Sequence, residues 1–238
     1  MTDFDQELDI EIRDQDDVGC RIILLAALSI WRDCDIHERA AWLRWLRSEG
    51  VMDIATRTET DVLESPVGNV LRASDADLCE RSADSITVLS WATALSDSSG
   101  LSLDDTTPRT LADGIPMAGE RIEPFLDQLV LRDEDLIALE RERAELWNWR
   151  LASEAILRTS AGRERNEVGE AIREVVLESA ISFAVDEIDT EDFLVDGVPV
   201  RKLGDAVLES LIVTSEERLR AFNWLCGLTE WASVHPLE

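Results

Sequence analysis

The chain has 238 residues, of which 45% are hydrophobic and eight are tryptophan, so it can bury a sizeable core. Its 51 acidic residues outnumber 23 basic ones and give a net charge of −28. That charge repels nucleic-acid phosphates and anionic lipid surfaces. No apolar stretch approaches the roughly 18 residues that cross a bilayer. We therefore expect a protein partner, and neither a nucleic acid nor a membrane.

Three explanations of the acidity stay open. The 23 cations include a single lysine, Lys202, which suits a salt-adapted protein whose carboxylates hold water at high ionic strength. A GC-rich genome also replaces lysine by arginine, but it does not by itself supply so many acids. A mimic of nucleic acid needs its acids on one face, whereas here they are spread along the chain. Salt adaptation is the explanation that the composition favours.

The N-terminus is acidic where a secretory signal is basic, so we expect a cytoplasmic protein. Residues 1–14 are expected to form an acidic, loosely ordered lead, and residues 15–238 a single α-helical domain. Four cysteines lie far apart without a C-x-x-C pair, and the two histidines have no ligand spacing beside them. We therefore expect no metal and no cofactor, and free thiols of the kind found in a reducing compartment.

The predicted elements of the first half are helices with recognisable ends. The almost continuously apolar run at 17–32 predicts a buried helix, and Asp35 and Gly50 bracket an amphipathic helix at 36–48. A short helix at 57–66 is expected to open with Thr58 and Asp61 and to stop before Pro66. The next helix, at 75–96, is apolar on nearly all sides and should be central.

Turn residues cluster at 97–116, which predicts either a surface loop or a weak boundary between halves. Helices are then expected at 120–131, at 133–158 with Asp133 as N-cap, at 164–185, and at 214–229 with Thr214 and Glu217 as a capping box. Between the last two, Asp196-Gly197 predicts a short hairpin or an extended lid near 192–203. The fold class is therefore mainly α, as a single compact multi-helix domain.

Two of these helices carry charges on their apolar sides. In helix 133–158, Arg150 and Glu154 fall in the apolar half, and in helix 214–229, Arg218 lies mid-arc. An unpaired charge in such a place costs several kcal/mol, so we expect Arg150 and Glu154 to pair with Arg218 or Glu217 across the two helices. Arg220 is expected in solvent. The candidate ligand-binding or structural ionic cluster comprises Trp147, Arg150, Glu154, Glu217, Arg218, Asn223 and Trp224, with no catalytic residue among them.

The C-terminal stretches EDFLVDGVPVRKLGDA and EERLRAFNWLCG resemble the end of the bacterial family catalogued as domain of unknown function 4272. That family has a DFPVFGKPYRDL-like stretch followed by ERHYALNWLCG, and ELWNWR, SWATALSDSSGL and RDQDDVGCRIILLAAL sit in its order, so the resemblance covers about 13–231. It implies a mostly helical, cytoplasmic protein and no established activity. The chain departs from the pattern at Leu219 and Arg220, where the family has His-Tyr, and in its ending TEWASVHPLE.

Two classes of function remain. The first is a non-catalytic interaction or accessory protein, in which the ionic cluster fixes how helices pack. The second is an enzyme or a binder of a small polar ligand, which uses a charged cleft between helices 133–158 and 214–229. A dry, paired cluster favours the first class and a pocket open to solvent favours the second.

Overall fold

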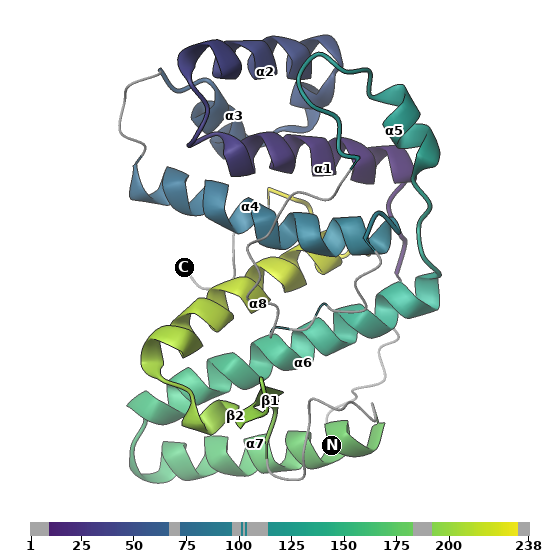
Figure 1. Ribbon diagram of the computed structural model, residues 1–238. Helices are drawn as coiled ribbons and strands as arrows, with labels where there is room; N and C mark the ends of the chain where they lie inside the picture. The colour runs from purple at the N-terminus through teal and green to yellow at the C-terminus, as the bar shows by residue number, and fades with distance from the viewer. Residues whose placement is uncertain are drawn as a thin grey trace.

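The computed structural model describes residues 10–66, 72–96, 101, 103, 114–182 and 192–232, with the backbone alone at 180–182. Within these ranges the chain is mainly α-helical, with one small hairpin, which confirms the expected fold class (Figure 1). No helix in the described ranges is long and apolar enough to span a membrane. The α-helices are α1 (Gln15–Ile30), α2 (Ile36–Ser48), α3 (Arg57–Leu63), α4 (Ala73–Ala92), α5 (Glu123–Gln128), α6 (Glu134–Thr159), α7 (Gly162–Ser182) and α8 (Asp205–Leu225).

The helices are stacked in layers, so that α2, α1, α4, α8, α6 and α7 follow one another from the top to the bottom of Figure 1. The short 3-10 helix η1 (Val51–Ile54) and α3 complete the upper layers. Gly19 on α1 lets α5 approach closely, because a Cβ there would lie 2.4 Å from the Cδ2 atom of Leu126. Most of the turn-rich segment 97–116 falls outside the described residues.

Two hydrophobic cores lie at opposite ends of this stack. The first core surrounds α1, whose residues from Val18 to Leu28 are almost all buried, and it draws on α2, α3, α4 and α5. The second core joins α6, α7 and the hairpin. Helix α8 belongs to both, because Leu208 and Leu211 enter the second core whereas Phe222 and Leu225 enter the first. Thus α8 ties the two ends of the molecule together.

Capping side chains explain where several helices begin. Asp35 accepts hydrogen bonds from the backbone N–H groups of His37 and Glu38, and Asp133 accepts one from Asp135, as predicted. Two predicted starts were wrong. The capping box of α3 is formed by Thr56 and Glu59 instead of Thr58 and Asp61. Helix α8 begins at Asp205, so Thr214 and Glu217 lie inside the helix.

The predicted hairpin is present as β1 (Leu194–Val195) and β2 (Val198–Pro199), which pair antiparallel. Asp196 and Gly197 form its turn with φ values of 49° and 72°, the left-handed geometry that a two-residue turn requires. The 3-10 helix η2 (Val200–Lys202) follows at once and leads into α8. The hairpin and η2 together thus connect α7 to α8.

The described start of the chain lies against the end of α8. The backbone N–H of Arg13 donates to the carbonyl of Leu225 at 2.9 Å, and that of Glu11 donates to Cys226 at 3.3 Å. Gly227 makes this approach possible, since it has a φ of 70° and a Cβ there would lie 2.7 Å from the carbonyl oxygen of Glu11. Residues 10–14 of the expected acidic lead are therefore packed, whereas residues 1–9 lie outside the described part.

Candidate functional site

The centre of the candidate site is a buried ionic group on α6. Arg150 donates from Nε to Oδ1 of Asp192 at 2.7 Å and from Nη2 to Oδ2 at 3.1 Å, a bidentate pair. The same Nη2 donates to Oε2 of Glu154, one turn along the helix, at 3.1 Å. The side chains of Arg150 and Asp192 are each 1% exposed and that of Glu154 is 4% exposed. The group therefore faces protein and not solvent.

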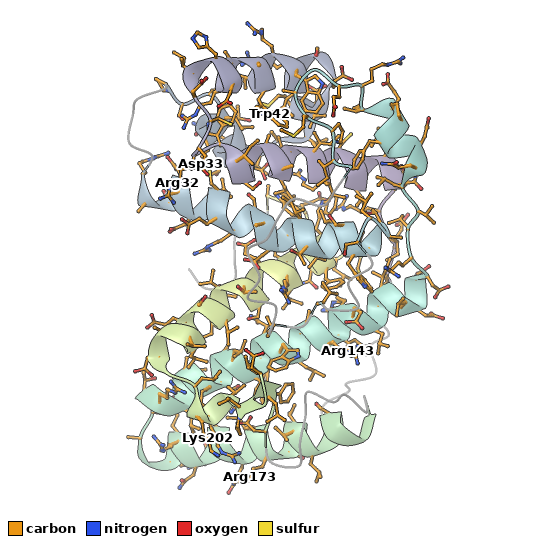
Figure 2. All side chains as sticks on the ribbon, viewed as in Figure 1. Arg32, Asp33, Trp42, Arg143, Arg173 and Lys202 are labelled. Atoms are coloured by element: carbon orange, nitrogen blue, oxygen red, sulfur yellow. The ribbon has the colours of Figure 1, made fainter. Side chains whose placement is uncertain are left out.

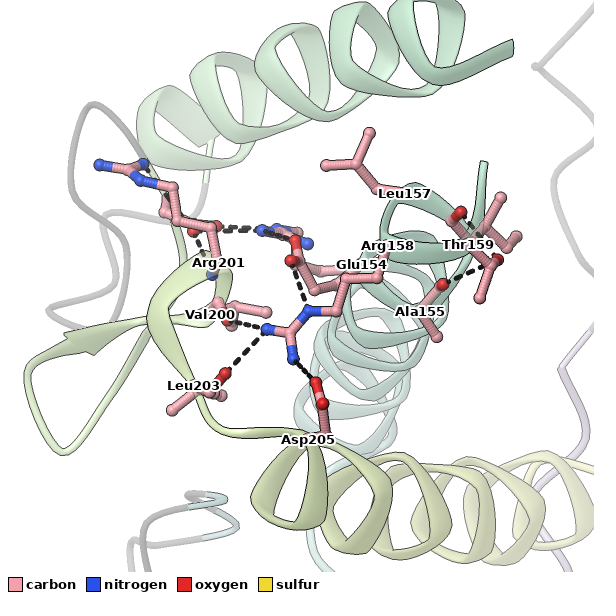
Figure 3. Close-up of polar contacts among 12 residues, drawn as sticks. Glu154, Ala155, Leu157, Arg158, Thr159, Val200, Arg201, Leu203 and Asp205 are labelled. Carbon is pink, nitrogen blue, oxygen red and sulfur yellow. Dashed lines mark hydrogen bonds and ion pairs between the residues drawn. The ribbon is translucent and has the colours of Figure 1, made fainter. Parts of the chain in front are cut away.

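Glu154 has a second arginine partner towards the end of α6 (Figure 3). Arg158 donates from Nε to Oε1 of Glu154 at 3.0 Å and from Nη1 to Asp205, the first residue of α8, at 2.6 Å. Burial lowers the pKa of Arg158, but the hydrogen bonds to these two carboxylates outweigh burial, so that the pKa lies above its usual value. Glu154 thus links the buried group to the start of α8.

Asp192 connects the helix to the hairpin. Besides Arg150, its carboxylate accepts hydrogen bonds from the backbone N–H groups of Phe193 at 2.9 Å and Arg201 at 3.0 Å. The ring of Phe193 meets Trp147 edge to face, with centroids 5.0 Å apart. Trp147 therefore packs against the residue that directly follows Asp192. Asp192 itself was missed, because nothing in its local sequence marks it as buried.

The predicted pairing between Arg218 and Glu154 was wrong, and the register of α6 against α8 explains why. Three contacts show that the helices are antiparallel, namely Arg158 to Asp205, Asn148 to Ser215, and Arg141 to Asn223. In this register Glu154 lies opposite Glu209, about nine residues or roughly 13 Å along the axis from Arg218. The partners of Glu154 in the structure are instead Arg150 and Arg158 on its own helix.

The α8 residues of the predicted cluster have partners elsewhere. Glu217 pairs with Arg220 at 2.7 Å and with Arg81 of α4 at 3.8 Å. Arg218 donates from Nη1 to the carbonyl of Leu101 at 2.6 Å. Asn223 accepts through Oδ1 from Nε of Arg141 at 2.9 Å. The seven predicted residues therefore form separate groups along the helices instead of one cluster.

Trp224 belongs to a second buried group, whose members lie too far apart in the sequence for helical periodicity to connect them. The ring of Trp231 has Arg21 at 4.6 Å and Arg220 at 4.3 Å from its centroid, and it meets Trp224 edge to face at 5.2 Å. Its Nε1–H donates to Glu59 at 2.8 Å. Arg220 is only 16% exposed, so its expected place in solvent was wrong.

Arg21 and Glu59 complete this second group. Both carboxylate oxygens of Glu59 accept from Nη1 of Arg21, at 3.0 and 3.1 Å. Burial lowers the pKa of Arg21 from its usual value, and the neighbouring carboxylate of Glu59 opposes that shift. A lone arginine inside the apolar run at 17–32 is the signal that could have predicted a paired, buried charge here.

Neither group offers an obvious reaction. Ser153, which precedes Glu154 on α6, is buried, but a serine needs an adjacent base to act as a nucleophile, and within the described residues it makes no hydrogen bond to a base. The described residues contain no group of three or more His, Cys, Asp or Glu side chains that could hold a metal ion. What the first group can do is hold α6, the hairpin and the start of α8 in a fixed arrangement.

A family model described as a domain of unknown function, number 4272, matches residues 3–168, which is more than half of the chain. The chain belongs to this family. The part that matches the 4272 family includes Arg150 and Glu154, whereas Asp192 and all of α8 lie beyond it, as do the two C-terminal stretches that suggested the resemblance. No curated protein and no solved structure matches the chain.

Proposed function

We propose that this member of the 4272 family is a non-catalytic interaction or accessory protein of the cytoplasm, whose partner is a protein with a basic surface. The observation that carries the proposal is a row of carboxylates on α7, which we term the glutamate stripe. It consists of Glu164, Glu167, Glu170, Glu174 and Glu178, all of them exposed.

The stripe follows from the way α7 is packed. Residues three and four apart lie on one face of a helix, and the five glutamates have these spacings. The opposite face buries Ile172 and Val176 in the second core, which fixes the stripe towards solvent. Helix α7 lies at the bottom of the molecule beside α6, so nothing in the described residues covers this face (Figure 1). Leu177, which is 56% exposed, adds apolar surface beside it.

The buried ionic group supports binding over catalysis. Arg150, Glu154 and Asp192 are paired with one another and shielded from solvent. Charges arranged in this way fix helix packing, whereas a substrate site needs some of them to be reachable. The acids that remain accessible are those of the surface, where they steer a basic partner towards the protein. The net charge of −28 also adapts that surface to high ionic strength.

The test compares capture of partners from an extract of the source cells by three forms of the full chain. The stripe variant carries Glu170→Gln, Glu174→Gln and Glu178→Gln. The control variant carries Asp77→Asn, Asp127→Asn and Glu209→Gln, which remove the same charge from exposed positions on α4, α5 and α8. A basic protein captured by the parent and the control, but not by the stripe variant, is the expected result.

The captured protein is then purified and its affinity measured by calorimetry. Three exposed ion pairs of about 0.5 kcal/mol each correspond to about a tenfold weaker Kd for the stripe variant. The control should stay within about twofold of the parent. Equal affinities for all three forms would remove the stripe from the interface, and the absence of any basic partner would contradict the proposal itself.

The alternative function, a small polar-ligand binder or enzyme, rests on one atom. Nη1 of Arg150 is buried and has no hydrogen-bond acceptor within the described residues. A ligand with a carboxylate or carbonyl oxygen would satisfy it. Under this alternative, a library of small polar metabolites contains a compound that raises the melting temperature of the parent and not that of Arg150→Met.

A further inference from the structure

Arg39, on the first turns of α2, is a buried arginine without an anionic partner. Its side chain enters the first core, where the residue is 9% exposed. Nε and Nη1 are both shut off from solvent, and neither has a hydrogen-bond acceptor in the described part of the chain. Within the same part, no ion pair involves this residue, whereas the buried Arg21 and Arg150 each pair with a carboxylate. The guanidinium carbon lies over the ring of Trp31, 5.4 Å from its centroid.

Trp31 adds another donor at the same place. Its ring is 1% exposed and its Nε1–H has no acceptor among the described residues. Burial raises the pKa of the Cys34 and Cys79 thiols, the charge of Arg39 lowers both values, and the carboxylates of Glu38 and Asp75 raise them, the first at Cys34 and the second at Cys79. The turn that leads from α1 to α2 brings these groups together, and Arg32 and Asp33 of that turn lie towards the start of α4 (Figure 2). The buried N–H groups of Arg39 and Trp31 thus have no hydrogen-bond acceptor among the described residues, although carboxylates lie around the site.

Within the described residues, the carboxylates nearest to Arg39 in the sequence form no ion pair with its side chain. Asp35 and Glu38 form the capping box of α2, in which each accepts backbone N–H hydrogen bonds. Arg32 pairs with Glu80 of α4 at 2.6 Å, so that carboxylate is also engaged. A buried guanidinium with no hydrogen-bonded counter-charge is strongly destabilising, and a cation–π contact offsets only part of that cost. A water molecule would satisfy donors but would leave the charge unbalanced.

We propose that Arg39 and Trp31, at the junction of α1, α2 and α4, bind a small monovalent anion, with chloride as the ion of fitting size and chemistry. The Nε–H and Nη1–H bonds of a guanidinium point to different edges of the group, so a single spherical acceptor beside Nε takes the hydrogen bond of Nε together with that of the indole N–H. A tetrahedral oxyanion such as phosphate brings several more oxygens than these donors can satisfy, and each unsatisfied oxygen would be buried at a cost. The adjoining thiols are weak donors that also suit a soft halide.

Thermal unfolding of the full chain in different potassium salts tests this proposal. Screening of the net charge depends on ionic strength and is the same for all monovalent salts, whereas binding depends on the identity of the anion. At a chloride concentration of about 100 times Kd, the melting temperature should exceed that in potassium gluconate, at equal ionic strength, by about 5–10 °C for a chain of this size. Bromide should act like chloride, and phosphate should act like gluconate.

Two variants and one control identify the site. Arg39→Gln removes the charge, and Trp31→Phe keeps an aromatic ring but removes the indole N–H. Both should lose most of the difference between chloride and gluconate. Arg44→Gln, an exposed position on the same helix, should keep it. If Arg39→Gln does not fold, Trp31→Phe and crystals of the parent soaked in bromide still decide, with an anomalous peak expected at Nε of Arg39.

Three results would overturn the proposal. The first is an identical melting temperature in chloride and gluconate, which would leave the cation–π contact as the only compensation for Arg39. The second is stabilisation by formate but not by chloride or bromide, which would make the ligand a carboxylate. The third is a chloride effect that persists unchanged in both variants.

Discussion

Asp192→Ala should destabilise the protein strongly, because Arg150 would stay buried without the carboxylate that holds two of its nitrogens. Removal of one partner from a buried ion pair costs about 3–5 kcal/mol. The backbone N–H groups of Phe193 and Arg201 also lose their acceptor, so the upper half of that range is expected. For a chain of this length the loss corresponds to a melting temperature lower by roughly 6–20 °C.

Urea unfolding followed by circular dichroism measures this loss directly. The matched control is Asp205→Ala, which breaks the 2.6 Å ion pair between Asp205 and Arg158. The side chain of Asp205 is 84% exposed. An exposed pair contributes about 0–1 kcal/mol, so the control should unfold almost as the parent does. Arg150→Met combined with Asp192→Leu should recover much of the loss, since neither charge is then stranded. If Asp192→Ala and Asp205→Ala unfold alike, the reasoning about the buried group is refuted.

The remaining predictions concern a glycine and two cysteines. Gly227→Ala should lower the free energy of unfolding by about 1–3 kcal/mol, because alanine disfavours a φ of 70° and its Cβ would press on Glu11. The control is Gly119→Ala at a φ of 99°. It has open space around it, so it should lose only the conformational part of that free energy. Urea unfolding measures both, and equal losses would contradict the close approach of the chain start to α8. Burial raises the pKa of Cys79 and Cys226 to about 11, so roughly 0.1% of each thiol is ionised at pH 8. Peptide mass spectrometry after treatment with iodoacetamide should find both unmodified in the native protein and modified in urea; rapid modification of either in the native protein would disprove its burial.

Helix positions could be predicted well from the sequence where a local signal coincides with the helix end. Asp35 and Asp133 mark true starts because their side chains accept backbone hydrogen bonds from the first turn. Thr214 and Glu217 have the same spacing but lie within α8, because an S/T-x-x-E pattern also occurs on the surface of a continuous helix. The helix starts instead after Gly204, where no side chain caps it.

The partners in the ionic groups could not be predicted from the sequence, because helical periodicity tells which face a residue occupies but not its height against a neighbouring helix. Arg150 and Glu154 were correctly placed on a buried face. The main partner of Arg150, Asp192, lies 42 positions further along the chain and reaches it because the segment before the hairpin folds back on α6. The register of α6 against α8 is likewise not contained in the periodicity of either helix. It keeps Arg218 away from Glu154, and Arg218 donates to the carbonyl of Leu101 instead.

Two departures from the 4272 pattern contact each other in the structure. In the C-terminal resemblance, which lies beyond the residues 3–168 that the family model matches, Arg220 stands in place of a tyrosine and Trp231 lies in the differing ending. The guanidinium carbon of Arg220 is 4.3 Å from the ring centroid of Trp231, close enough for a cation–π interaction. The two differences therefore meet in the structure, where Arg220 also pairs with Glu217 and Trp231 also contacts Arg21.

The contact between residues 10–13 and the end of α8 has a consequence for biosynthesis. Arg13 donates to Trp224 and Leu225, which the ribosome adds more than 200 residues later. Arg21 likewise gains its contact with the ring of Trp231 only after that residue has been synthesised. Because such long-range contacts form slowly, the first core stays partly open throughout translation until α8 and the segment after it emerge. We expect the nascent chain to need protection by a chaperone over α1, the most apolar helix, during most of its synthesis.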